Sequence, residues 1–181
     1  MTITIYHTQL WQPLLKIWNK RKFMKTDKYF TILYLIILGT VIGAVIYAGA
    51  VVAPVTFHTE KWLGNDILGR FQEGLIMTQN FIRLGYFILI TIFAIVIYEG
   101  YQYKRFNRDL IKTLSAMGAI SSALLFKYFY MSSILDMQKN GEVAVNNQIF
   151  ENMHKGSEIA LILFLFFTLI LFIKTLLKEL K

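Results

Sequence analysis

The feature that most constrains this chain is a set of four apolar blocks, each near the roughly 20 residues that cross a bilayer as a helix. The blocks cover residues 29–52, 76–98, 110–133 and 158–177. Hydrocarbon cannot satisfy free backbone groups, and no block alternates polar and apolar residues as barrel strands do. The pattern therefore predicts an all-α, polytopic membrane protein built as a bundle of four transmembrane helices.

Composition excludes the soluble classes. The chain is 56% hydrophobic and 17% charged, whereas soluble domains carry about 25% charged residues. An ordinary soluble enzyme and a disordered chain are therefore excluded. The absence of cysteine removes disulfides, iron–sulfur clusters and thiolate zinc sites. We expect one membrane domain, residues 29–177, with no cofactor.

The basic residues predict the topology. Of the 19 Lys and Arg residues, 13 fall on the side that holds both termini and the second loop, and four fall in the first and third loops. The positive-inside rule then places both termini and the second loop in the cytoplasm. Orientation and anionic lipid account for the net charge of +8. RNA binding is the rival explanation, but no readout motif accompanies these residues, so we expect no nucleic-acid partner.

Residues 1–28 are too short and too polar to cross the membrane. Five apolar residues share one helical face and four basic residues surround it, a pattern typical of an interfacial amphipathic helix. Met24 is an alternative start of the chain, and residues 178–181 form a basic tail. The apolar residues are Leu10, Trp11, Leu14, Leu15 and Trp18, and the basic ones are Lys16, Lys20, Arg21 and Lys22.

Proline and glycine mark expected helix ends. Pro54 should end or kink the first span at Ala53. In the third loop, Asn140–Gly141 is a turn signal, and a short amphipathic helix should follow it and end at Gly156.

Small residues indicate which spans pack closely, because helices in lipid associate where their backbones can approach. The first span carries Gly39, Gly43 and Ala48, and the third carries Gly118 and Ser122. We expect these two spans to be central and the bulky fourth span to be peripheral. A homodimer through the first-span glycines is the alternative use of that face.

A polar cluster is expected in the outer half of the bundle. Arg83 and Lys127 lie inside spans, where an ionisable residue is a functional candidate. We expect them to face nearby carboxylates, either as ion pairs that fix helix order or as a site for an anionic ligand or pathway. The predicted cluster comprises Glu73, Asn80, Arg83, Lys127, Asp136 and Glu158.

Metal binding is a second candidate chemistry. His58 and His154 fall in outward loops, with Met153 on the same side. Imidazole with thioether suits Cu(I), although no His-x-x-Met or Met-x-x-Met spacing occurs. No motif for nucleophilic catalysis, zinc proteolysis or nucleotide binding is present, so we expect no enzyme activity.

The stretch GAVIYAGAVVAPVTF at residues 43–57, followed by ILGRFQEGLIM at residues 67–77, resembles a known family. It is similar to the bacterial four-span proteins grouped with the transmembrane protein 205-like domain of unknown function, over roughly residues 29–177. The resemblance implies a four-helix protein of a bacterial inner membrane without an assigned reaction. A weaker resemblance is to the copper-resistance protein D family.

These observations lead to one expectation about function and one alternative. We expect a non-enzymatic accessory or assembly subunit that contacts the lipid bilayer and binds other membrane proteins or a second copy of itself. The alternative is a small transporter or a copper- or metal-handling protein that uses the polar outer half of the bundle. A transporter would need Asn80, Arg83 and Lys127 to line a cavity.

Overall fold

The computed structural model describes residues 27–64, 67–105 and 109–180. Within these residues every regular element is a helix, and four helices are long and apolar enough to cross a membrane. The predicted fold class is confirmed. The amphipathic helix expected within residues 1–28 falls on residues 10–22, which lie outside the described part of the chain.

The four spanning helices are longer than the apolar blocks. They cover Asp27–Thr56, Arg70–Lys104, Leu110–Lys139 and Gln148–Glu179. The second span is α4 (Arg70–Lys104) and the fourth is α8 (Gln148–Glu179). At 1.5 Å per residue, α4 extends about 52 Å, against about 30 Å for the hydrocarbon core. The ends of the helices can therefore stand at the depth of the lipid headgroups.

The first and third spans each contain a wide turn. In the first, η1 (Ala48–Val52) leads into α2 (Ala53–Thr56), so the helix does not end at Ala53, one of the two expected effects of Pro54, but continues to Thr56. The amide of Ala53 bonds to the carbonyl of Ala48, five residues back. Proline lacks an amide hydrogen and clashes with the carbonyl four residues before it, so widening at this point lets the helix continue past Pro54.

The third span is assembled from three consecutive elements. They are α5 (Leu110–Leu124), η2 (Leu125–Tyr130) and α6 (Met131–Lys139). Asp109 caps α5, because its Oδ1 accepts hydrogen bonds from the amides of Ile111 at 2.9 Å and Lys112 at 3.3 Å. Two short helices lie in the loops, α3 (Glu60–Leu63) and α7 (Glu142–Val145).

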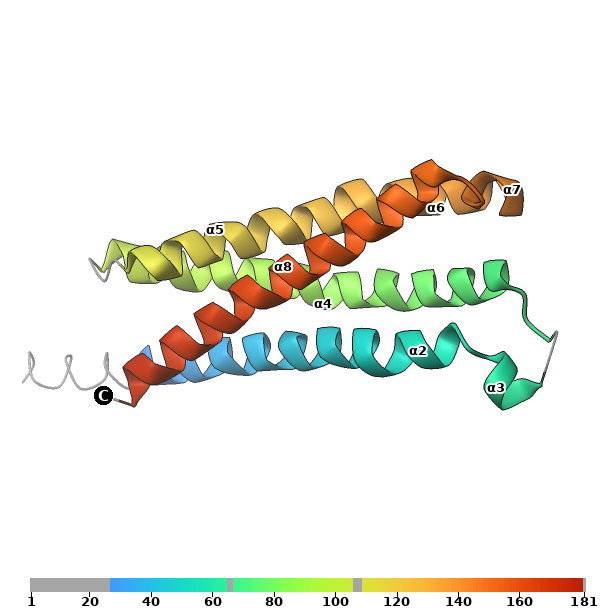
Figure 1. The fold of residues 1–181 in the computed structure, drawn as a ribbon. Helices are drawn as coiled ribbons and strands as arrows, with labels where there is room; N and C mark the ends of the chain where they lie inside the picture. Colours follow the sequence, from blue (N-terminus) through green and yellow to red (C-terminus); the bar gives the residue numbers. More distant parts are fainter. Residues whose placement is uncertain (1–26, 65–66, 106–108, 181) are drawn as a thin grey trace, which may run out of the picture.

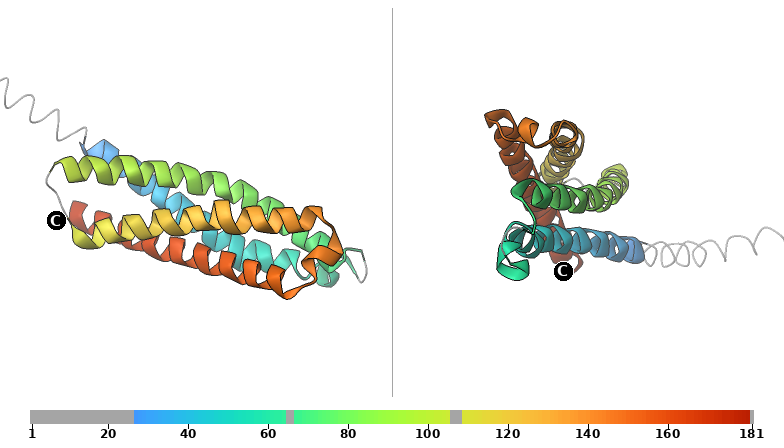
Figure 2. Two further views of the ribbon diagram at one scale, coloured as in Figure 1. Left: turned by 90° about the horizontal axis from the view of Figure 1, so that it is seen from above. Right: turned by 90° about the vertical axis from the view of Figure 1, so that its right-hand side faces the viewer.

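The helix α8 crosses the bundle diagonally (Figure 1). It packs along α5 and η2 and reaches α6, and at its other end it lies beside the first span (Figure 2). Phe164 and Leu171 of α8 belong to the common core. The expectation of a peripheral fourth span was therefore wrong. Small residues on its neighbours accept its bulky side chains, as at Gly118, where the ring of Phe167 fills the space of a missing Cβ.

Gly156 does not end a helix in the third loop. It lies inside α8, which begins at Gln148 after the cap in which Asn147 accepts a hydrogen bond from the amide of Phe150. A Cβ at Gly156 would lie 2.2 Å from Cε1 of Tyr130. The glycine is therefore a packing contact between the third and fourth spans.

We call the two ends of the bundle by what they hold. The terminal end holds the start of the first span, the end of α4, the start of α5 and the end of α8, and the far end holds α3 and α7 (Figure 1).

Candidate functional site

The predicted polar cluster is dispersed over the far half of the bundle. Glu73 is buried, and its Oε1 accepts hydrogen bonds from the amide of Thr59 at 3.0 Å and the hydroxyl of Thr59 at 2.5 Å. Arg70 lies 3.6 Å from the other oxygen. Glu73 therefore fixes the loop around α3 to the start of α4. Asn80 donates to the carbonyl of Ile76 in its own helix.

The two intramembrane cations do not face the expected carboxylates. Arg83 is exposed, and no ion pair within the described ranges includes it. The Nζ atom of Lys127 lies 4.9 Å from the ring centroid of Tyr86. Gly85 leaves room for it, because a Cβ there would come within 3.2 Å of Nζ. The expected pairing of Arg83 and Lys127 with the carboxylates is therefore corrected.

The remaining carboxylates of the cluster pair within their own helices. Asp136 contacts Lys139 at 2.9 Å, and Glu158 contacts His154 at 3.2 Å, both at exposed positions. Neither pair connects two helices, and exposed pairs of this kind contribute little to stability.

The predicted packing residues divide into two groups. Gly118 meets Phe167, Ser122 is buried and donates to the carbonyl of Gly118 at 2.6 Å, and Ala48 is buried in the core. Gly39 lies against Phe172, which a Cβ would meet at 3.5 Å. Pro54 and Gly43, in contrast, are exposed, and nothing in the described part of the chain lies within 4 Å of a Cβ built on Gly43.

The predicted metal ligands are not gathered. His58 bonds through Nδ1 to the carbonyl of Pro54 at 2.9 Å, and His154 bonds to Glu158. Met153 is half-buried one residue before His154. Among the residues that the structure describes, no group of three His, Asp or Glu side chains could hold a metal ion.

A different polar cluster is assembled at the terminal end. Its centre is the ion pair between Lys112 of α5 and Glu99 of α4, with 3.1 Å between Nζ and Oε1. The two side chains are only 8% and 16% exposed, respectively. Tyr34 of the first span donates its hydroxyl to the same Oε1 at 3.2 Å. Three spans therefore meet at one carboxylate.

Tyr98 connects this ion pair to the helix ends. Its ring stacks on that of Tyr34 with centroids 3.9 Å apart. Its hydroxyl accepts a hydrogen bond from Gln102 at 2.9 Å and lies 3.1 Å from the hydroxyl of Thr31. Thr31 donates its one proton to the carbonyl of Asp27. Tyr98 must therefore donate to Thr31, and the bonds form one directed chain from Gln102 to Asp27.

The carboxylate of Asp27 joins the first span to α4. It accepts hydrogen bonds from the hydroxyl of Tyr101 at 2.7 Å and from the guanidinium of Arg105. The hydrogen bond to Asp27 raises the pKa of Arg105 above its usual range. This contact holds the start of the first span against the end of α4.

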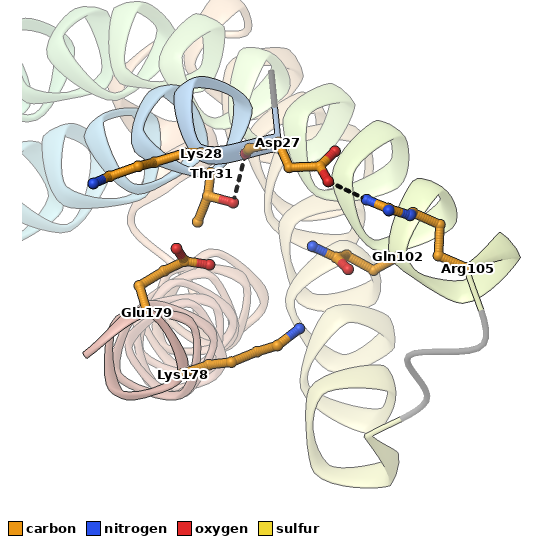
Figure 3. Close-up of a pocket in the computed structure, with 7 residues that line it drawn as sticks. All are labelled: Asp27, Lys28, Thr31, Gln102, Arg105, Lys178 and Glu179. Atoms are coloured by element: carbon orange, nitrogen blue, oxygen red, sulfur yellow. Dashed lines mark hydrogen bonds and ion pairs between the residues drawn. The ribbon is translucent and has the colours of Figure 1, made fainter. Parts of the chain in front are cut away.

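A pocket opens beside this network, with a volume of about 460 Å³. It lies between the first span, the end of α4 and the end of α8 (Figure 3). Its lining combines cationic, anionic and neutral polar groups, which can donate and accept hydrogen bonds to a charged ligand. The lining residues are Asp27, Lys28, Thr31, Gln102, Arg105, Lys178 and Glu179.

Sequence reasoning missed this cluster because its members lie near the ends of the apolar blocks. There, Lys112 and Arg105 served only as topology signals. One available signal is the recurrence of Tyr98, Glu99 and Tyr101 at one block end, since aromatic residues gather at the membrane interface.

Comparisons with known proteins place the chain in a family. A family model described as "Domain of unknown function (DUF4149)" matches residues 36–143. Neither the curated proteins nor the solved structures contain a match. The matched region runs from the first span through the third and covers more than half of the chain. The chain therefore belongs to the DUF4149 family, whose function is unknown.

Proposed function

We propose that this membrane protein is a non-enzymatic accessory or assembly subunit that binds a helix of another membrane protein along its first span. The observation that carries the proposal is the open space at Gly43. A Cβ built there meets nothing within 4 Å among the described residues, although the glycine lies in the middle of a spanning helix.

The first span is the least enclosed of the four, so the expectation that it is central was wrong. In its most apolar window, 22% of the residues are buried, against 33–39% in the other spans. Its exposed positions recur at steps of four and three residues, which form one continuous stripe along a helix. The stripe consists of Tyr29, Leu33, Ile36, Thr40, Gly43, Tyr47 and Ala50.

The stripe is small at its centre and bulky at its sides. Thr40 and Gly43 are adjacent small members of the stripe, Ile36 and Tyr47 flank this pair, and Ala50 is a further small member at the end. A partner helix can bring its backbone close at such a position, and close approach is the main source of helix association in lipid. Lipid chains alone would fit a uniformly bulky face equally well, as over residues 86–97 of α4, where the exposed side chains are Tyr86, Phe87, Ile90, Phe93, Val96 and Ile97.

The test uses the absence of native cysteine. Thr40→Cys and Tyr47→Cys each place a single thiol on the stripe, and crosslinking in native membranes should join the chain to a distinct larger protein. Phe93→Cys on α4 is the control and should give no such product. If the chain crosslinked only to a second copy of itself, the stripe would be a homodimer interface and the proposal of a separate partner would be wrong. If the cysteine on α4 gave the same product as those on the stripe, the stripe would not be the interface.

Steric blocking gives an independent check. Gly43→Ile fills the open space and should reduce co-purification of the partner by about tenfold, the effect of losing about 1.4 kcal/mol of contact energy. Gly100→Ile on α4 is the matched control, because a Cβ at Gly100 also meets nothing within 4 Å in the described part of the chain. Loss of the partner in both variants would point to a general effect on folding and contradict the proposal.

The transport alternative receives no support from the far half of the bundle. Asn80 bonds to its own helix, Lys127 lies over Tyr86, and Arg83 is exposed. Asn80 and Lys127 are therefore engaged within the described bundle, whereas Arg83 is exposed outside its packed core.

The proposal includes a bacterial inner membrane, with the terminal end in the cytoplasm, and kinship with the transmembrane protein 205-like group. The supports are the excess of Lys and Arg at that end and the motif after Gly43. A reporter enzyme that is active only in the cytoplasm should be active when it is fused between Lys104 and Leu110. If only a reporter that requires export were active at this position, the orientation would be reversed.

A further inference from the structure

The pocket at the terminal end offers charges of both signs to one ligand. We propose that it binds a phosphate ester that also carries an ammonium group, as in the ethanolamine headgroup of a phospholipid. The inference is independent of the partner interface, because the pocket lies between the first span, α4 and α8, whereas the stripe around Gly43 lies on the exposed face of the first span.

Three charged residues of the lining, Lys28, Lys178 and Glu179, are in no ion pair among the described residues, and Lys28 points away from the other two (Figure 3). Asp27 is already matched by Arg105 and Tyr101. By contrast, no ion pair within the described residues includes Lys178 or Glu179. These two neighbours on α8 therefore supply one cation and one anion to the pocket that the ion pairs of the described chain do not use.

The two side chains face different parts of the pocket (Figure 3). The ammonium of Lys178 extends toward the side of Gln102, and the carboxylate of Glu179 points toward Thr31. A phosphate placed near Lys178 would meet cationic and amide donors. An ammonium group in the same ligand would then lie near the carboxylate of Glu179.

Position and size favour a lipid as the source of this group. The pocket stands at the ends of helices that exceed the hydrocarbon thickness, and Tyr98 and Tyr101 mark the interface depth. Its volume of about 460 Å³ lies in the range of small-molecule sites. The opening and its charges thus match a headgroup in the adjoining leaflet.

The experiment uses the full chain, purified in mild detergent, with native mass spectrometry as the readout. Phosphatidylethanolamine and phosphatidylglycerol with identical acyl chains are added separately. We expect tighter retention of phosphatidylethanolamine by the unmodified chain. Lys178→Gln should weaken retention of both lipids by about tenfold. Glu179→Gln should remove the preference for ethanolamine while retaining phosphate binding.

Matched controls lie at the other end of the same helix. Lys155→Gln and Glu151→Gln remove the same charges at exposed positions of α8, and both should leave lipid retention unchanged. Thermal unfolding of all four variants verifies that each one folds. Lys178 and Glu179 are exposed at a helix end, so their substitutions should fold normally.

A water-soluble competitor distinguishes a lipid headgroup from a free phosphate ester as the ligand. Competition by excess O-phosphoethanolamine, with the same response to Lys178→Gln, would assign the pocket to a free phosphate ester. Retention of lipid despite the competitor would assign it to the headgroup of a bilayer lipid. Equal retention of both lipids, unchanged by either variant, would overturn the proposal.

Discussion

The ion pair between Glu99 and Lys112 should contribute measurably to the stability of the folded bundle. Lys112→Met removes the cation and leaves the Glu99 carboxylate with the hydrogen bond from Tyr34. Breaking a buried pair costs about 3–5 kcal/mol. Because Glu99 is 16% exposed, we expect a smaller cost of about 2–3 kcal/mol.

The double substitution Glu99→Gln with Lys112→Met should be much less harmful than the sum of the two single ones. The new amide at position 99 would keep Tyr34 as a partner, and no charge would remain buried there. Replacing a buried pair by neutral groups is often near neutral, so we expect a coupling energy of about 2 kcal/mol. Thermal unfolding in detergent should show each single variant about 4–12 °C lower, at about 2–4 °C per kcal/mol.

An exposed pair in the same chain provides the control. Asp136 and Lys139 of α6 lie 2.9 Å apart with side chains that are 70% and 73% exposed, so their distance is similar, but they are exposed and belong to one helix. Their coupling energy should be below about 0.5 kcal/mol. A coupling at Glu99 and Lys112 no larger than at this control pair would refute the argument from burial.

Two further substitutions test packing and the dispersed far-half residues. Gly156→Ala should destabilise the fold by about 1–3 kcal/mol, because its Cβ would overlap the ring of Tyr130; Gly43→Ala, where the space is open, should not, and equal unfolding temperatures would contradict this. Arg83→Gln should change stability by less than about 0.5 kcal/mol, since Arg83 is exposed, and a larger loss in thermal unfolding would indicate a partner within the bundle.

The site was less predictable than the fold. In a sequence, charged residues deep in a span such as Arg83 and Lys127 are predicted to be functional, because a charge in hydrocarbon is costly. The groups that meet are instead Tyr34, Glu99 and Lys112, each near the end of an apolar block. Their meeting depends on which helices are neighbours and how each is rotated, and neither quantity is encoded in local periodicity.

The four spans follow from the chain alone, because bilayer thickness and backbone hydrogen bonding set the length and type of each apolar segment. The small-residue signals, in contrast, acquired their meaning only from tertiary packing. Gly118 and Gly156 receive the rings of Phe167 and Tyr130, whereas Gly43 receives no side chain from the described part of the chain. Any glycine leaves the same space at the position of its missing Cβ. The diagonal course of α8 across its neighbours decides which of these spaces are filled by other side chains.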